Sequence, residues 1–117
     1  MARYDVYPNP NSEDRVVTPY LLDVQNNFLE IETRVVVPLH DAGGFRLASV
    51  RDLNPELDVQ QKLLIMNTAA IGAIPAADLR RPLVNLSSQS AEIQTALDTL
   101  FGGFYCQAAQ SAPNTKT

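Results

Sequence analysis

Short stretches of alternating or clustered apolar residues predict a series of β-strands along most of the chain. Apolar and polar positions alternate through residues 20–25, and valine dominates residues 33–39, which stop near Pro38. The apolar run within residues 62–68 has the length of a buried strand. The pattern predicts strands at residues 4–7, 20–25, 33–39, 62–68 and 69–75, the last with Gly72 as a candidate bulge.

Two stretches lack this pattern. Residues 40–58 contain the breakers Gly43-Gly44 and Asn54-Pro55, so we expect a long excursion there, with a helical turn near residues 48–53. Residues 78–86 contain few periodic apolar positions, and we expect a loop.

A continuous apolar stripe at helical spacing predicts one helix near the end of the chain. The stripe has the spacing i, i+3, i+4, i+7, i+8 and i+11, and its residues are Ile93, Ala96, Leu97, Leu100, Phe101 and Phe104. Gly102-Gly103 interrupts the stripe, and glycine tolerates the left-handed conformation that ends a helix, so we expect a C-terminal cap there. Ser87, Ser88 and Ser90 are alternative N-caps, because a serine oxygen accepts a hydrogen bond from an amide of the first turn.

Antiparallel strands followed by one terminal helix favour a mainly β fold with a C-terminal α-helix. We expect a bent antiparallel sheet or partial barrel with the helix packed on it. No repeat or boundary interrupts residues 1–104, which predict a single domain. Residues 105–117 are small and polar, and they predict a disordered tail.

The composition is that of one globular domain. Of 117 residues, 45 % are hydrophobic, enough for a core that needs no metal or disulfide. The single cysteine, Cys106, cannot form an internal disulfide, which is consistent with a reducing compartment. No apolar run is long enough to span a membrane, and residues 1–5 lack the apolar core of a signal peptide, so we expect a cytoplasmic protein.

The charge counts against general affinity for nucleic acids. The formal net charge is −4, whereas nonspecific binding to DNA or RNA depends on cations that neutralise phosphates. Arg80-Arg81 is the one adjacent basic pair, and we interpret it as two solvated arginines in a loop before Pro82.

Residues that could support catalysis are too few and too scattered. One histidine and one cysteine cannot build a conventional metal site. His40 and Asp41 are adjacent on a predicted strand, so their side chains point to opposite faces. Gly43-Gly44 lacks the lysine and hydroxyl of a phosphate-binding loop, and Cys106 has no local base. We therefore expect no enzymatic activity, no metal and no cofactor.

Apolar recognition surface is the stronger signal. Phe28 and Leu29 follow Asn26-Asn27 in a predicted turn, where one sheet offers little burial. Two interpretations stay open: the pair packs against the sheet edge, or it contacts a partner. Asp98 follows Leu97 at the rim of the helical stripe, where a carboxylate is ordinarily solvated.

Three segments, in order, resemble the CcdB family of plasmid and chromosomal toxins. The first runs from Pro19 to Asp23-Val24-Gln25 and continues, after a short turn, from Thr33 to the Val37-Pro38-Leu39 step. The second is Leu53-Asn54-Pro55 with the stretch from Leu64 to Pro75, and the third runs from Glu92-Ile93 to Phe101-Gly102-Gly103-Phe104. The resemblance covers residues 4–104, and the Asp-Val-Gln to Val-Pro-Leu block is its most specific part.

The resemblance implies a CcdB/MazF-type fold, which is a bent antiparallel sheet related to SH3-like barrels with a C-terminal helix. It also implies a homodimer that binds the A subunit of DNA gyrase and traps the complex in which DNA is cleaved but not resealed. A CcdA-type antitoxin would neutralise this toxin, and operator DNA would be contacted only through the toxin–antitoxin complex, which represses its own operon.

The resemblance also suggests residues for each partner. The implied gyrase contacts are Phe28, Leu29, Asp98, Phe101, Gly102, Gly103 and Phe104. The implied antitoxin contacts are Asn26, Phe28, Asp98 and Phe104, and the implied dimer contacts are Leu97, Leu100 and Phe101. The best-known family member has tryptophan at the position of Gly102 and asparagine at that of Asp98, and the family normally stops near Phe104.

Two other functions remain open at this stage. A MazF-like endoribonuclease could use the same fold, but it needs a basic RNA groove with a positioned acid or base. A decayed homologue could still bind antitoxin while no longer contacting gyrase, because Gly102 and residues 105–117 depart from the family pattern.

Overall fold

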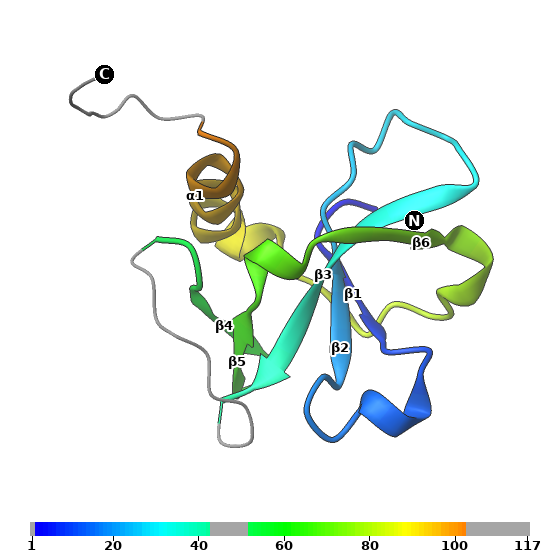
Figure 1. Ribbon diagram of the computed structural model, residues 1–117, viewed down its shortest axis with the longest axis horizontal. Coiled ribbons are helices and arrows are strands. Elements are labelled where there is room, and N and C mark those ends of the chain that lie inside the picture. Colours follow the sequence, from blue (N-terminus) through cyan, green and yellow to red (C-terminus); the bar gives the residue numbers. More distant parts are fainter. Residues whose placement is uncertain (1, 43–51, 103–117) are drawn as a thin grey trace.

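An antiparallel sheet that curls into a half-barrel forms the body of the molecule (Figure 1). The computed structural model describes residues 2–42 and 52–102. Within these residues the sheet has seven strands in the order β4-β5-β3-β2-β1-β7, and β6 pairs with β3 alone. The strands are β1 (Asp5–Pro8), β2 (Tyr20–Asp23), β3 (Thr33–Asp41), β4 (Glu56–Val59), β5 (Lys62–Met66), β6 (Gly72–Pro75) and β7 (Val84–Asn85).

The α-helix α1 (Ser90–Phe101) follows the strands. In the described part of the chain, four short 3₁₀ turns join the elements: η1 (Ser12–Asp14), η2 (Thr68–Ala70), η3 (Ala76–Asp78) and η4 (Ser87–Gln89). The predicted mainly β fold with a C-terminal helix is therefore confirmed.

The long strand β3 produces the curl of the sheet. Its first half pairs with β6, with Val36 opposite Gly72, and its second half pairs on the same edge with β5, where Leu39 faces Met66. β2 occupies the other edge, with Asp23 opposite Val36. Because two strands share one edge of β3, the sheet bends between them and offers two separate faces for packing.

Side-chain alternation then divides the apolar residues between two cores. Leu22 and Val37 point to the larger core, which α1 covers. Leu21 and Val36, their neighbours in sequence, point to a smaller core that also holds Tyr7 and Leu79.

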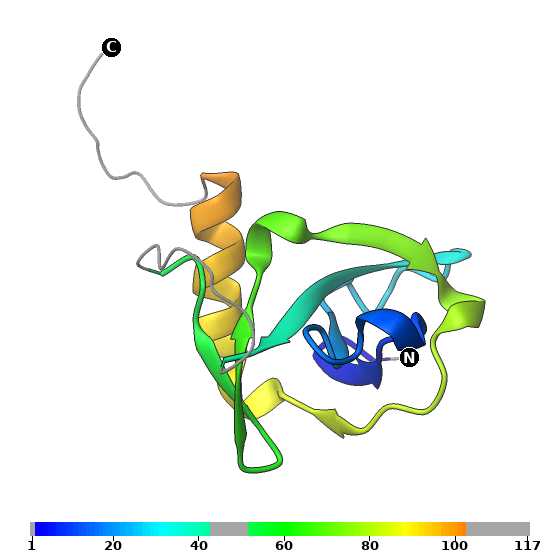
Figure 2. The same cartoon turned by 60° about the horizontal axis from the view of Figure 1, so that its bottom comes forward.

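The helix α1 closes the larger core by lying against the β4–β5 hairpin (Figure 2). Its buried residues are Ile93, Ala96 and Leu97, the first three of the predicted stripe. At its start, the Gln89 side chain accepts a hydrogen bond from the Asp58 amide (2.9 Å) and donates one to the Asp58 carbonyl (2.8 Å). These two bonds place the beginning of the helix beside β4.

A buried ion pair joins β2 to β3. The Arg34 guanidinium donates from Nε to Asp23 Oδ2 (2.8 Å) and from Nη2 to Asp23 Oδ1 (2.9 Å). The Asp23 side chain is inaccessible to solvent, and that of Arg34 is 6 % exposed. Asp23 Oδ1 also accepts a hydrogen bond from the Gln25 amide (2.9 Å). A buried charge is stable only when it is paired and hydrogen-bonded, and this geometry meets both needs.

Several sequence predictions need correction. β4 lies within the stretch expected to be an excursion, because Pro55 precedes the strand, where its missing N–H costs nothing, rather than breaking it. The short β7 lies within the predicted loop and exists through pairing with β1. Gly72 pairs in regular register with Val36, so the expected bulge is absent.

The expected serine N-cap is also wrong. Gln89 occupies the N-cap position without a side-chain cap, because its amide binds Asp58, and Ser90 is already helical. The predicted C-cap is confirmed: Gly102 has φ +76° and its N–H donates to the Asp98 carbonyl. The predicted Gly43-Gly44 breaker, most of the 48–53 turn, Gly103, Phe104 and the 105–117 tail with Cys106 lie outside the described residues. The 1–104 domain boundary therefore stays a prediction.

We expect Gly102→Ala to lower the free energy of unfolding by about 1 kcal/mol. An added Cβ at Gly102 meets no atom within 4 Å, so the loss is conformational and not steric. Gly102→Asn serves as the control and loses less, because asparagine tolerates the left-handed region. Urea unfolding measures both, and equal losses would contradict the capping role.

We expect Arg34→Met to lower the free energy of unfolding by about 3–5 kcal/mol, because it leaves the Asp23 carboxylate buried without its partner. Lys62→Met is the matched control, since Lys62 forms an exposed ion pair with Asp41, and it leaves the urea midpoint unchanged. A stable Arg34→Met protein would show that the ion pair is dispensable for folding.

Buried Tyr7 makes the free energy of unfolding fall as the pH rises into the alkaline range. Burial, reinforced by the Asp5 and Asp23 carboxylates, raises the pKa of Tyr7 to about 12. The stabilisation of the neutral phenol is complete below about pH 10, the ordinary tyrosine pKa, and is lost as the pH rises towards 12. Urea unfolding between pH 9 and 12 should show a steeper loss for the wild type than for Tyr7→Phe; parallel curves would contradict this assignment.

Candidate functional site

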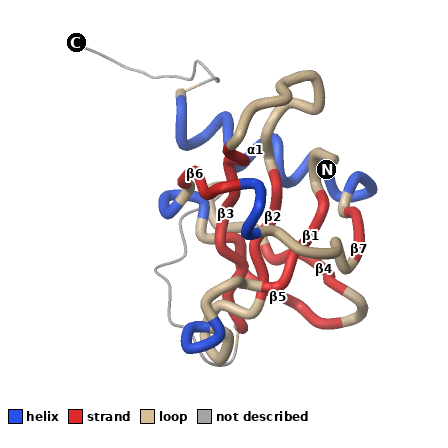
Figure 3. The backbone as a smooth tube through the Cα atoms, turned by 90° about the vertical axis from the view of Figure 1, so that its right-hand side faces the viewer, coloured by secondary structure: helices blue, strands red, loops and turns tan. Residues whose placement is uncertain are grey.

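A groove lies between the turn that follows β2 and the C-terminal end of α1. Both segments are at the same end of the molecule (Figures 1 and 3). The groove has a volume of ≈ 380 Å³, and we call it the turn–helix groove. Its lining combines apolar and polar side chains: Val24, Gln25, Asn26, Leu29, Val35, Ile71, Gln94, Leu97, Asp98 and Phe101.

Asn26 shapes the turn wall of this groove. Its side-chain Oδ1 accepts a hydrogen bond from the Phe28 amide (2.9 Å), and its carbonyl accepts one from the Leu29 amide (3.1 Å). Asparagine favours such turns because its side chain can bind the backbone two residues on. The tight turn leaves Phe28 92 % exposed and Leu29 48 % exposed. Phe28 therefore does not pack against the sheet edge, which was one of the two interpretations left open by the sequence.

The buried ion pair supports the base of this turn. Arg34 Nη1 reaches the Leu29 carbonyl and Nη2 reaches the Gln25 carbonyl, both at 3.5 Å. The two ends of the turn thus converge on one guanidinium, whose own position is held by Asp23. Because its backbone is anchored in this way, the turn keeps its conformation while its apolar side chains remain exposed to solvent.

Gln25 carries a buried donor without a partner at the floor of the groove. Its Oε1 accepts a hydrogen bond from the Val35 amide (2.8 Å), which fixes the orientation of the side-chain amide. Its Nε2 is buried and has no hydrogen-bond partner within the described residues. A buried amide without a hydrogen-bond partner costs free energy, so this side-chain NH₂ group lowers the stability of the folded protein.

The helix wall has a buried base and an exposed rim. Leu97 is 7 % exposed and belongs to the larger core, whereas Phe101, one turn later, is 70 % exposed. Asp98 lies between them and accepts a hydrogen bond at Oδ1 from Gln94 Nε2 (3.2 Å). Leu100 is half-buried and lines no part of the groove.

The structure brings most of the predicted contact residues together. Of the described ones, five line the groove, Phe28 adjoins Leu29 in the same turn, and Gly102 ends α1 directly after Phe101. Gly103 and Phe104 lie outside the described residues. The turn and the helix end thus share one surface, with these predicted contact residues lining the groove: Asn26, Leu29, Leu97, Asp98 and Phe101.

Other residues of this surface were not found from the sequence. Ile31 is 57 % exposed in the same segment, and its position between two glutamates was a usable signal. Val35, Ile71 and Gln94 gave no such signal, because only the folding of distant segments places them along the groove.

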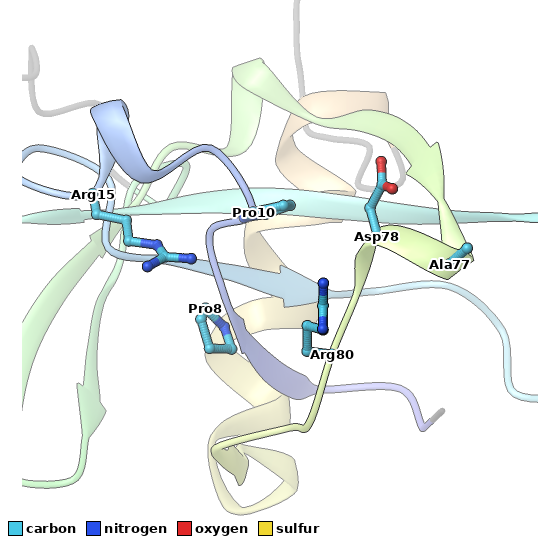
Figure 4. Close-up of a pocket in the computed structure, with 6 residues that line it drawn as sticks. All are labelled: Pro8, Pro10, Arg15, Ala77, Asp78 and Arg80. Carbon is cyan, nitrogen blue, oxygen red and sulfur yellow. The ribbon is translucent and has the colours of Figure 1, made fainter.

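A second hollow lies near η1 and η3 and shares no lining residue with the turn–helix groove. Figure 4 shows Arg15 and Arg80 on either side of Pro8 and Pro10, with Asp78 at one edge of a cavity of ≈ 480 Å³. Arg15 Nε donates to the Asn9 carbonyl (2.6 Å). A neighbouring apolar groove of ≈ 590 Å³ shares Pro10 and Asp78 with it. The predicted solvated arginines are exposed, and this face holds both charge signs.

His40 is part of the fold rather than of either surface. Its ring lies between Thr18 Oγ1 (2.8 Å from Nδ1) and Asn67 Nδ2 (3.0 Å from Nε2), and the residue is 6 % exposed. Burial lowers the pKa of His40, which favours the neutral ring. It lines none of the hollows described above.

Residues 2–42 and 52–102 contain neither a cluster of metal-ligating side chains nor a helix that could span a membrane. In that part of the chain, no three His, Cys, Asp or Glu side chains gather to hold a metal ion. Over the same residues, α1 is too short and too polar to cross a membrane, and no longer helix is present.

Comparison with known proteins identifies the family. The family model described as CcdB protein matches residues 3–103, a span that contains every strand and α1. A search of curated proteins finds no match. The chain belongs to the CcdB family, whose members are toxins of toxin–antitoxin systems.

Proposed function

We propose that this CcdB-family toxin acts by binding the A subunit of DNA gyrase through the turn–helix groove, and that it traps the cleaved gyrase–DNA complex. The observation that carries the proposal is the exposure of two aromatic side chains at one end of the molecule. Phe28 is 92 % exposed on the turn and Phe101 is 70 % exposed on the helix, and Leu29 and Phe101 line the groove. Exposed aromatics around a groove are typical anchors for a protein partner.

The mechanism that we propose is differential binding and not catalysis. A ligand that prefers the open, cleaved state of gyrase shifts the population towards that state without changing any covalent bond. The toxin then needs shape and contact area but no reactive group. His40 is buried, and the described residues contain no group of three His, Cys, Asp or Glu side chains that could hold a metal ion. Both observations are compatible with this role.

The remaining partners follow from the same surface. A CcdA-type antitoxin would neutralise the toxin by covering Asn26, Phe28 and Asp98, so that antitoxin and gyrase compete for one face. A homodimer through the helix would use the half-buried Leu100 and the exposed Phe101, with Leu97 supporting them from the core. Operator DNA would be reached only through the toxin–antitoxin complex, in the cytoplasm where gyrase acts.

The MazF-like endoribonuclease is the second candidate, and one observation favours it. Arg15 and Arg80 flank a cavity of ≈ 480 Å³ on the opposite face, where they could contact phosphates (Figure 4). Asp78 shares that cavity and offsets part of the positive charge. The exposed aromatics lie elsewhere, so the gyrase proposal accounts for more of the surface.

The decayed-homologue alternative rests on Gly102, which has no side chain where the best-known family member has tryptophan. Phe101 immediately before it is exposed, and it can supply an aromatic anchor one position earlier. Retention of a gyrase contact therefore requires a shifted anchor and not the same one.

A gyrase DNA-cleavage assay with the purified full-length protein tests the proposal. We expect accumulation of cleaved DNA, and we expect Phe101→Ala and Phe28→Ala each to weaken binding to gyrase A by about 10- to 100-fold, the range for an aromatic hot spot. Leu63→Ala is the matched control, because Leu63 is 54 % exposed on β5 and lines no part of the groove. Surface plasmon resonance or calorimetry supplies the affinities.

Each alternative gives a different result in the same experiment. Cleavage of RNA that Arg80→Ala abolishes would establish the endoribonuclease. Binding of a CcdA-type antitoxin arm with no trapped DNA would establish the decayed homologue. Equal losses for Phe101→Ala and Leu63→Ala would show that gyrase binds some other surface.

A further inference from the structure

The two walls of the turn–helix groove come from distant parts of the chain, and little holds them together directly. Within the described residues, no hydrogen bond joins the 26–29 turn to α1. Both walls are instead hydrogen-bonded to one residue of the N-terminal segment, Arg3. Arg3 did not stand out in the sequence, because its partners are 24 and 91 positions away.

The backbone of Arg3 reaches the turn wall. Its N–H donates to Oδ1 of Asn27, which lies between Asn26 and Phe28. Its carbonyl accepts a hydrogen bond from Asn85 Nδ2 (2.9 Å) at the end of β7. The Arg3 main chain is therefore held on both sides, and it supplies a fixed point beside the turn.

The side chain of Arg3 reaches the helix wall. Nη2 donates to Gln94 Oε1 (2.7 Å), and Gln94 Nε2 in turn donates to Asp98 Oδ1 (3.2 Å). The guanidinium also lies over the Tyr4 ring, 5.0 Å from its centroid, which restricts its rotation. Because Gln94 Oε1 accepts from Arg3, its NH₂ group is the end that faces Asp98, and the carboxylate is held on the groove wall.

This arrangement has an energetic cost that indicates a specific role. Arg3 Nε is buried with no hydrogen-bond partner within the described residues. A side chain as long as arginine near the chain start could extend into water and avoid this penalty. It remains folded against Gln94 because the contacts to Gln94 and Tyr4 outweigh the unsatisfied Nε.

We propose that Arg3 is a positioning residue for partner recognition: it clamps the 26–29 turn to α1 and, through Gln94, orients the Asp98 carboxylate in the groove. This rests on the proposed function, since the groove is the surface offered to gyrase A. Asp98 Oδ2 forms no hydrogen bond within the described residues and is the oxygen left for a partner's donor. A clamped groove loses less conformational entropy on binding than two independent walls do.

The first test compares the affinities of three full-length variants for gyrase A. We expect Arg3→Ala to weaken binding about 5- to 10-fold, a loss typical of one coupled network. Arg3→Lys recovers part of this loss, because its ammonium can still donate to Gln94 Oε1. Arg81→Ala removes an exposed arginine that forms no ion pair with a described residue, and it stays within about twofold of the wild type.

A double-mutant cycle distinguishes positioning from a direct contact. If Arg3 acts through Asp98, the Arg3→Ala/Asp98→Ala protein binds no worse than Asp98→Ala alone. Additive losses would show that Arg3 contacts the partner by itself and would overturn the proposal.

A second measurement needs no partner. ¹⁵N relaxation of the free protein should show lower order parameters for the Phe28 and Leu29 amides in Asn27→Ala, which loses the hydrogen bond to the Arg3 N–H, than in Arg81→Ala, with core amides unchanged. Arg3→Ala keeps that backbone hydrogen bond and removes only the arm to Gln94, so it tests the helix side of the clamp. Unchanged order parameters of the turn in Asn27→Ala would overturn the clamp even if the wild type binds gyrase. Lower order parameters in that variant, together with no gyrase binding by the wild type, would support the clamp and reject only the proposed function.

Discussion

The Asp23–Arg34 ion pair is the interaction on which the architecture of this toxin depends. It joins the end of β2 to the first half of β3, where Arg34 pairs with Ile74 of β6 and Asp23 lies opposite Val36. The same guanidinium is within 3.5 Å of both ends of the 26–29 turn. Two buried charges are costly to desolvate, and this pair is retained with every strong donor directed at an acceptor. One polar contact thus joins two strands of the sheet and supports the turn that forms one wall of the turn–helix groove.

The helix α1 changes from buried to exposed apolar side chains along its length. The first turns of α1 bury Ile93, Ala96 and Leu97 in the larger core, and the last turn exposes Phe101. Gln89 ties the start of the helix to β4, and Gly102 ends it in a left-handed conformation. Because the helix is anchored at its start and its middle, its end can carry apolar surface without loss of the fold. A partner that covers this end gains buried area that the isolated protein leaves unused.

A binding mechanism places different demands on the chain than catalysis does. Among the described residues, His40 is buried between Thr18 and Asn67 and lines neither the turn–helix groove nor the hollow near η1 and η3. The turn–helix groove instead combines an apolar lining with a few polar groups whose positions are set by a network that includes Arg3, Gln94 and Asp98. In the function that we propose, preorganisation of this surface lowers the entropic cost of binding to one conformation of gyrase.

The sequence by itself determined the elements whose signal is local. The valine-rich strand, the Asp-Val-Gln strand, the helical stripe and the glycine that ends it all follow from period and propensity over a few residues, and the family resemblance rested on the same segments. The strand β4 was missed because Asn54-Pro55 was taken as a breaker, whereas Pro55 precedes the strand. The two-residue β7 and the role of Gln89 in place of a serine cap were missed because each exists through a partner far away in the chain. The turn and the helix end were each predicted to be recognition surface, but only the tertiary structure decided that they form one groove. Arg3 and Gln94 joined that groove through contacts 91 positions apart, and no local pattern encodes a contact of that range.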